Sequence, residues 1–146
     1  MTGPDRPPHH RRAGELTVAE LHDLLRLRVD VFVVEQDCPY SELDGRDLEP
    51  TTGHWWFEDE GRIVAYLRTL EDPDGSLHIG RVVTEPDARG RGLAGMLLAE
   101  ALSRVGRPVH LKAQSHLTHW YASFGFLADG DEFVEDGIAH TPMILE

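Results

Sequence analysis

The chain has 146 residues, which suits one domain with its own hydrophobic core. Its 26 acidic and 14 basic side chains give a net charge of −12 at pH 7, opposite in sign to what a nucleic-acid surface requires. No apolar run approaches the length of a membrane span, and the single cysteine, Cys38, has no partner for an internal disulfide. We therefore expect neither nucleic acid nor membrane as a partner, and a cytoplasmic, reducing environment.

The beginning of the chain differs in composition from the rest. Residues 1–14 are rich in proline, arginine and histidine and lack the apolar segment of a secretory signal. We expect residues 1–14 to be a disordered leader and residues 15–146 to form a single domain.

A long helix and a long loop are predicted next. Thr17 and Glu20 have the spacing of a capping box, and apolar residues follow at helical intervals, which predicts a helix over residues 18–34. The segment 36–53 is irregular, with room for a short second helix. Its carboxylates are Asp37, Glu42, Asp44 and Asp47. Because so long a connection in a compact domain is often functional, this loop is a candidate for part of a site.

The remaining elements predict a sheet with helices. Strands are expected at residues 54–58, 62–69 and 77–84, as an antiparallel meander joined by turns. Two helices at 92–105 and 116–124 and short strands at 109–113, 133–134 and 141–145 follow. This order predicts an α/β (α+β) domain.

The loop Arg89-Gly90-Arg91-Gly92, between a strand and a helix, carries the clearest chemistry. Glycines let a ligand approach the backbone closely, and the first turn of a helix offers unpaired N–H groups to an anion such as a pyrophosphate. The two arginines add cations. A nucleotide P-loop would need Gly-Lys-Ser/Thr, and a dinucleotide fingerprint would follow a parallel strand rather than a meander. A plain glycine-rich turn remains an equal alternative for this loop by itself.

Two segments resemble the GNAT superfamily of acyltransferases. Residues Val82 to Ala94 resemble its acetyl-CoA signature, Gln/Arg-x-x-Gly-x-Gly/Ala, and Tyr121 to Phe126 resembles its Tyr-x-x-x-Gly-Phe element. Other segments resemble the ElaA-type subgroup, namely residues 27–40, Asp44-Gly45, Gly80-Arg81-Val82 and residues 135–140. The resemblance covers residues 16–146 and implies a mixed, mostly antiparallel central sheet flanked by helices.

The resemblance also implies a cofactor site. The co-substrate would be acetyl-CoA, lying in a V-shaped split between two central strands. Its pantetheine would bind the main chain at Val82, Val83 and Thr84. Its pyrophosphate would bind Arg89, Gly90, Arg91, Gly92, Leu93, Ala94 and Gly95. Gln114 occupies a position where many family members have asparagine, and Gln114 and Phe124 are further expected cofactor contacts.

The implied reaction is N-acetylation of a primary amine on a small molecule or peptide, by direct attack on the thioester. Tyr121 stands at the family's usual general-acid position, although a half-buried helix tyrosine with a routine partner would look the same in sequence. Some members have a glutamate base where this chain has Val109. The candidates for a base are Glu35, Asp44, His78, His116 and His140. Glu35 is named as the provisional catalytic partner of Tyr121.

Several alternatives remain open from sequence. The chain could be a non-catalytic acyl-CoA sensor, or an acyl transferase like the acyl-homoserine lactone synthases, which segment 28–32 also resembles. Tyr40, Trp55 and Trp56 are candidates for an acceptor pocket, though core packing explains them equally well. His116 and His119 have a spacing seen in metal sites, but we expect no metal. A homodimer is left open.

Overall fold

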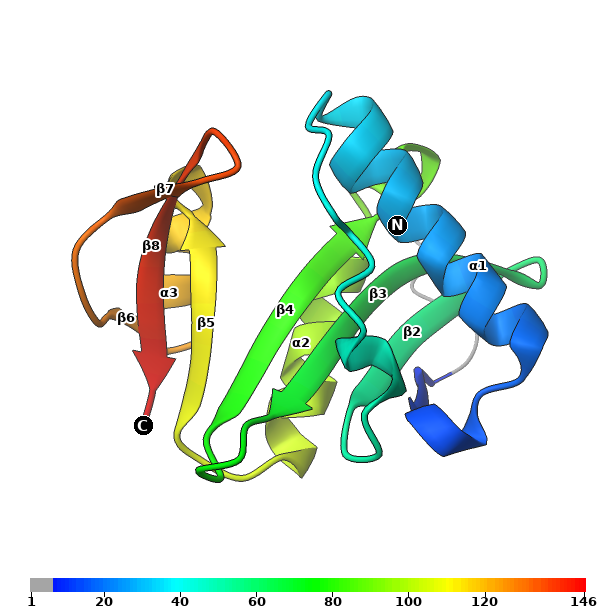
Figure 1. Cartoon of the computed structure of the whole chain (residues 1–146), viewed down its shortest axis with the longest axis horizontal. Helices are drawn as coiled ribbons and strands as arrows, with labels where there is room; N and C mark the ends of the chain where they lie inside the picture. Colours follow the sequence, from blue (N-terminus) through cyan, green and yellow to red (C-terminus); the bar gives the residue numbers. More distant parts are fainter. Residues whose placement is uncertain (1–6) are drawn as a thin grey trace.

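The computed structural model describes residues 7–146, which form a sheet with helices on both faces (Figure 1). The strands are β1 (His9–Arg12), β2 (Gly53–Asp59), β3 (Arg62–Glu71), β4 (Leu77–Thr84), β5 (Val109–Gln114), β6 (Leu127–Ala128), β7 (Phe133–Glu135) and β8 (Ile138–Leu145). Their order is β1-β2-β3-β4-β5-β8-β6, and β7 pairs with β8. Among the strands of residues 7–146, only β4 and β5 are parallel neighbours.

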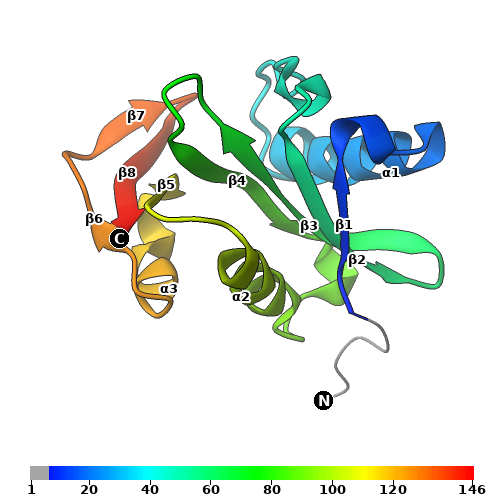
Figure 2. The ribbon, with the colours of Figure 1, turned by 90° about the horizontal axis from the view of Figure 1, so that it is seen from below.

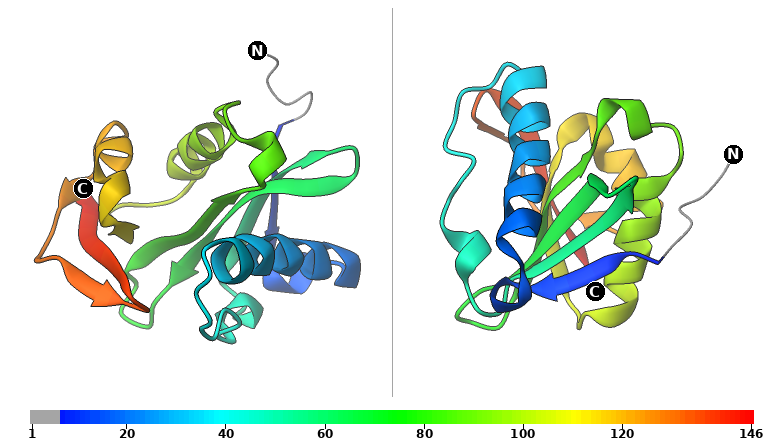
Figure 3. Two further views of the ribbon diagram at one scale, coloured as in Figure 1. Left: turned by 90° about the horizontal axis from the view of Figure 1, so that it is seen from above. Right: turned by 90° about the vertical axis from the view of Figure 1, so that its right-hand side faces the viewer.

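The helices lie in two layers. They are α1 (Val18–Arg28), α2 (Leu93–Arg104) and α3 (Thr118–Ala122), together with the π-helix η2 (Val29–Glu35) and the 3-10 helices η1 (Ala13–Glu15), η3 (Arg46–Leu48), η4 (Pro86–Ala88) and η5 (Ser115–Leu117). Helix α1 covers one face of the sheet, and α2 and α3 cover the other (Figures 2 and 3). Each face therefore has its own hydrophobic core.

The two cores follow the alternation of strand residues. Trp55 and its neighbours at alternate positions pack against α2, whereas Trp56, Ile63 and Tyr66 pack against Leu24 and other residues of α1. Both tryptophans are almost completely buried. They are core residues, and the alternative that they line an acceptor pocket is not supported.

The predicted first helix divides into two kinds of turn. Thr17 caps it as expected, since its hydroxyl accepts from the Glu20 N–H at 3.0 Å and the Glu20 carboxylate accepts from the Thr17 N–H at 2.9 Å. The regular α-helix ends at Arg28, and residues 29–35 continue as a π-helix. This stretch is rich in β-branched valine, which crowds a regular helix, and wider π-turns often lie at functional sites.

The predicted disordered leader is wrong for its second half. His9–Arg12 form the edge strand β1, paired antiparallel with β2, and Ala13–Glu15 form a 3-10 helix. The imidazole of His10 stacks on Trp55 with 3.7 Å between ring centres, and His9 stacks on Trp56 at 5.3 Å. These histidines supply the flat, half-buried surface that apolar residues supply in most strands. Residues 1–6 lie outside the described part of the chain.

The remaining predicted elements are present with shifted ends. The helix expected over 116–124 is the 3-10 helix η5 followed by α3, and the last strand, β8, begins at Ile138 rather than Thr141. The two-residue strand β6 was not predicted. The short helix expected in the long loop is η3.

Candidate active site

The centre of the sheet is split between β4 and β5. These parallel strands pair only where they begin, Leu77 with Val109 and His78 with His110, and then diverge (Figure 1). A bulge in β4 helps to redirect it, because Arg81 has a φ of +55° and the register between β3 and β4 shifts there. Strand β5 pairs along its whole length with β8 instead. The result is the V-shaped split that the resemblance implies.

A cleft of about 550 Å³ occupies this split. Its walls come from the long loop, β3, β4, β5, α3 and the β7–β8 hairpin, and include Asp44, Arg68, His78, Lys112, Tyr121 and His140. The Cys38 thiol donates to the backbone oxygen of Asp136 at 3.3 Å, so the long loop and the hairpin turn meet across the cleft. The predicted functional loop, residues 36–53, thus covers the cleft, and we call it the roof loop.

The loop before α2 presents a row of unpaired donors. Gly90 and Gly92 have φ values of +81° and +72°, and a Cβ added at either would meet no atom within 4 Å, so conformation rather than space requires glycine. From Gly90 to Gly95, no backbone N–H makes a close, well-aligned hydrogen bond to an acceptor among residues 7–146. Donors of this kind at the start of a twelve-residue helix suit an anion such as a pyrophosphate.

Both arginines of this loop are engaged by carboxylates. Arg89 donates to the two oxygens of Glu35 at 2.7 and 2.8 Å, and its Nε donates to the Thr84 carbonyl. Arg91 lies 3.0 Å from Asp59. A phosphate arriving here would compete with these carboxylates for the guanidinium groups, and exposed pairs of this kind exchange at little cost.

Tyr121 reaches the cleft from α3. Its side chain is buried, and burial raises the pKa of its phenol to about 12. The rings of Trp120 and Phe126 contact it edge-on, with centres 4.9 and 6.1 Å away. The hydroxyl makes no hydrogen bond within the described part of the chain, unlike the routine buried tyrosine considered above. A neutral phenol that faces a cleft, and whose proton is not engaged in a hydrogen bond, is suited to act as an acid.

The other predicted cofactor residues divide between cleft and core. Val82 and Gln114 line the cleft, whereas the Val83 side chain is buried in the core beneath α1. Gly95 and Phe124 are not in the cleft: a Cβ on Gly95 would lie 3.4 Å from the Phe124 ring, so these two residues bring α2 and α3 together. Gly95 and Phe124 lie on the face of the sheet that α2 covers.

The two carboxylates considered as a base are poorly placed for that role. The hydrogen bond from Arg89 lowers the pKa of Glu35, and Glu35 does not line the cleft. Asp44 does line it. Burial acts to raise the pKa of Asp44, but hydrogen bonds from Arg68 and from the Arg46 backbone outweigh burial and hold it well below its usual range. Neither carboxylate takes up protons readily near neutral pH.

Two of the three candidate histidines line the cleft. His78 lies with its Nε2 2.8 Å from Asp72, and burial lowers the pKa of its ring even though Asp72 acts in the opposite direction. The Nδ1–H of His140 donates to the Ile138 carbonyl at 2.8 Å, which leaves Nε2 as the acceptor nitrogen. His116 is exposed on η5 and does not line the cleft.

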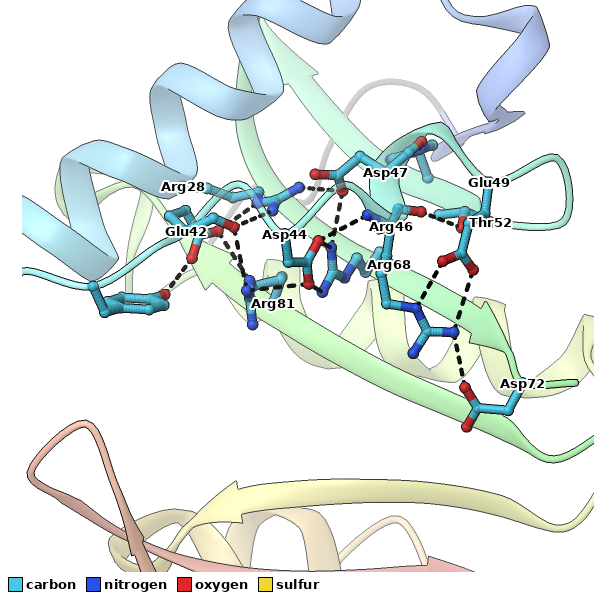
Figure 4. Close-up of polar contacts among 12 residues, drawn as sticks. Arg28, Glu42, Asp44, Arg46, Asp47, Glu49, Thr52, Arg68, Asp72 and Arg81 are labelled. Carbon is cyan, nitrogen blue, oxygen red and sulfur yellow. Dashed lines mark hydrogen bonds and ion pairs between the residues drawn. The ribbon is translucent and has the colours of Figure 1, made fainter.

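A buried network of ion pairs holds the roof loop in place (Figure 4). Arg28, which is fully buried, donates to Glu42 at 2.7 Å and to Asp47 at 2.6 Å. Arg68 donates to Asp44 and Asp47, and Arg81 donates to Glu42 at 3.0 Å. Tyr40, which lines the cleft, donates its hydroxyl proton to Glu42. Three of the four carboxylates noted in the loop are therefore structural.

Sequence reasoning missed the cations of the cleft. Arg68, Arg81 and Lys112 line it, yet none of them was named as a candidate site residue, and Arg81 entered only as part of the Gly80-Arg81-Val82 segment of the resemblance. They lie on three different strands, so no local pattern in the sequence brings them together. Within residues 7–146, no group of three His, Cys, Asp or Glu side chains is arranged to hold a metal ion, and no helix is long and apolar enough to cross a membrane.

Comparisons with known proteins agree with this geometry. A family model of the acetyltransferase (GNAT) domain matches residues 21–146. The UPF0039 protein Rv2851c of Mycobacterium tuberculosis is 50% identical over 137 residues, covering 90% of this chain and 88% of that protein. Protein ElaA of Escherichia coli is 41% identical over 147 residues, covering 94% and 93%.

Solved structures give the same answer for the fold. The crystal structure of an acyl-CoA N-acyltransferase from Pseudomonas aeruginosa superimposes with a TM-score of 0.89 at 40% identity, covering 95% of this chain and 99% of that one. The CoA-dependent acyl-homoserine lactone synthase BjaI, at 17% identity and a TM-score of 0.76, shares the fold alone. The predicted α+β fold is confirmed, and the chain belongs to the GNAT acetyltransferase family, as a relative of ElaA.

Proposed function

We propose that this acyltransferase is an N-acetyltransferase that moves the acetyl group of acetyl-CoA onto a primary amine. The observation that carries the proposal is the Tyr121 phenol, which is buried, protonated and without a hydrogen-bond partner among residues 7–146, in the wall of the cleft between β4 and β5. The donor-rich loop before α2 follows β4 in the chain. A proton donor is needed where a thiolate leaves, and an anion site is needed where a pyrophosphate binds. The two stand on neighbouring elements.

On the donor side, the N–H groups from Gly90 to Gly95 bind the pyrophosphate, and the diverging edge of β4 from Val82 to Thr84 binds the pantetheine through its main chain. Arg89 and Arg91 exchange their carboxylate partners for phosphate oxygens. A main-chain N–H of β4 polarises the thioester carbonyl, as an oxyanion donor does.

On the acceptor side, the amine enters the cleft beneath the roof loop and attacks the thioester carbon directly. We propose His140 as the group that takes up the amine's proton, because its Nδ1 is already a donor and its Nε2 is free to accept. Tyr121 gives its proton to the departing thiolate and regains one from solvent. No covalent enzyme intermediate is required.

The test is release of free thiol from acetyl-CoA in the presence of a panel of polyamines, aminoglycosides, amino acids and peptides with free N-termini. The proposal predicts thiol release that depends on at least one amine class. CoA that binds, with no amine-dependent thiol release across the panel, would instead support the acyl-CoA sensor alternative.

A further inference from the structure

Lys112 is the only lysine in the chain, and it stands unpaired in the acceptor cleft. Its ammonium lies 5.7 Å from the centre of the Phe133 ring, and it forms no ion pair with any carboxylate of residues 7–146. The other cations that line the cleft, Arg46, Arg68 and Arg81, each have carboxylate partners. Lys112 is therefore the one lysine or arginine of the cleft lining that no carboxylate of residues 7–146 pairs, although Glu135 and Asp136 also line the cleft.

The sheet register places Lys112 on the same face of the sheet as Arg68, whose guanidinium is a second hydrogen-bond donor. Arg68 pairs directly with Gly80 across β3 and β4, and His78 pairs with His110 across β4 and β5. The two histidine rings stack with centres 5.2 Å apart, so they share one face of the sheet. Two residues further along each strand, Gly80 and Lys112 continue on that face. Arg68, Gly80 and Lys112 therefore form a row across the three strands.

The middle of this row is open. Gly80 has no side chain, and a Cβ added there would meet no atom within 4 Å. Because β4 and β5 diverge beyond His78, the space between Gly80 and Lys112 widens toward the cleft. A ligand group can rest on Gly80 between the two cationic side chains.

Arg68 supplies the second donor. It is 3% exposed, and Asp44 and Asp47 hold its terminal nitrogens. Its Nε–H is the one buried side-chain polar atom without a partner among residues 7–146. A buried donor left unpaired is costly, so this N–H needs an acceptor that the protein itself does not provide.

A carboxylate fits this row. It offers two acceptor oxygens, one for the ammonium of Lys112 and one for the Nε–H of Arg68. A phosphate dianion fits less well, since its second negative charge would be repelled by the four carboxylates that line the cleft, Asp44, Asp72, Glu135 and Asp136. Tyr121 and His140 line the same cleft, so a molecule bound here by its carboxylate lies beside the proposed acetyl-transfer groups.

We propose that the acceptor is an amino acid or similar primary amine that carries a carboxylate, and that Lys112 is the residue that selects it. This inference rests on the proposed acetyl transfer and names its acceptor class. A charge-assisted hydrogen bond of this kind changes binding by about tenfold or more.

The experiment compares matched acceptors and matched variants. Thiol release from acetyl-CoA is measured with L-amino acids and with the amines that remain when their carboxylates are removed. Wild type is expected to show a KM at least about tenfold lower for the amino acids. Lys112→Met should remove that preference by raising the KM of the amino acids to that of the plain amines. Lys112→Arg should restore most of it.

A second measurement does not depend on turnover. Binding of N-acetyl amino acids and of their uncharged amides to the CoA-loaded protein is followed by ligand-observed NMR. Wild type should bind the acids in preference to the amides, and Lys112→Met should not. Equal binding of acids and amides, or the same preference in Lys112→Met, overturns the inference. Turnover of plain amines with no carboxylate preference overturns it too, but leaves the proposed acetyl transfer standing; absence of any turnover counts against the acetyl transfer instead.

Discussion

The carboxylate of Glu35 accepts two hydrogen bonds from the guanidinium of Arg89, at 2.7 and 2.8 Å. A phosphate would bind the same arginine in the same bidentate arrangement. Glu35 ends the π-helix that leads into the roof loop, and Arg89 begins the loop before α2. The pair therefore joins the acceptor roof to the proposed phosphate site. We propose that Glu35, named from sequence as a base, instead competes with the cofactor's phosphate for Arg89.

Removing this competitor should strengthen CoA binding. Glu35→Gln leaves Arg89 free for phosphate, and because the pair is exposed, the expected gain is modest, about two- to fivefold in Kd by calorimetry. Glu100→Gln is the matched control, since it breaks an exposed Glu–Arg pair on α2 far from the loop's start. Weaker CoA binding by Glu35→Gln would show that the pair organises the site rather than competing with it.

Charge at Gly92 should decide whether the loop binds CoA. Gly92→Asp places a negative charge beside the N–H groups proposed for the pyrophosphate, whereas Gly92→Asn adds the same bulk without charge. Both residues tolerate positive φ better than most, and the space around Gly92 is open, so both variants should fold. Calorimetry should find CoA binding abolished by aspartate and retained in part by asparagine. Equal affinities of Gly92→Asp and Gly92→Asn for CoA would contradict the assignment of this loop as the pyrophosphate site.

Loss of the Tyr121 hydroxyl should affect turnover rather than binding. Tyr121→Phe removes the proposed acid and keeps the edge-on ring contacts, so kcat should fall about a hundredfold with the CoA dissociation constant unchanged. Because burial raises the pKa of Tyr121 to about 12, the phenol stays protonated and should impose no fall in rate between pH 7 and about pH 10. Turnover at the wild-type rate by Tyr121→Phe would contradict the role, whereas a fall in this range that Tyr121→Phe abolishes would keep the role and contradict the raised pKa.

The proposed base should be required for turnover. The Nδ1–H of His140 is held by the Ile138 carbonyl, so Nε2 is the nitrogen that takes up the amine's proton. His140→Gln removes this acceptor and should lower kcat by about a hundredfold with the affinity for CoA unchanged. His116→Gln is the control, because His116 lies outside the cleft. If His140→Gln keeps the wild-type kcat, His78 becomes the candidate to test.

The ion network should make stability sensitive to acid. Asp47→Asn leaves Arg28 and Arg68 short of a buried partner, and should cost about 3–5 kcal/mol of unfolding free energy near pH 7. Burial opposes ionisation of Asp47, but the bonds from Arg28 and Arg68 outweigh it, so its folded pKa is lowered. Its contribution is then present above about pH 4, the ordinary carboxyl value, and is lost as pH falls through the folded pKa.

Thermal or urea unfolding should accordingly find a large difference between wild type and Asp47→Asn at pH 7 that narrows toward pH 3. Asp131→Asn, at an exposed position, is the control. A difference that stays constant with pH would mean that packing, rather than charge, makes Asp47 important.

The sequence predicted the fold where the signal is local. The Thr17–Glu20 capping box, the meander turns and the glycine-rich loop each act within a few residues, and each is found where expected. The strand at His9 was missed because its stability comes from tryptophans more than forty residues away in the chain. The pairing of Glu35 with Arg89 likewise depends on tertiary contact, which composition and spacing do not reveal.

The acceptor half of the site was the least predictable for the same reason. Arg68, Gly80 and Lys112 come together only through the register of three strands, and no single segment of the sequence contains all three. The donor half was easier, because a phosphate site is built from consecutive residues of one loop. The roles proposed here for individual site residues remain predictions.

The most direct test is the stoichiometry of transfer. Purified protein is given acetyl-CoA and an amine, and free thiol and acetylated amine are measured in the same sample, the latter by mass spectrometry. One acetylated amine per thiol, at a rate about a hundredfold lower in Tyr121→Phe, is the predicted result. Thiol release without an acetylated amine, or transfer at the wild-type rate by Tyr121→Phe, would contradict the proposal that Tyr121 drives acetyl transfer in this cleft.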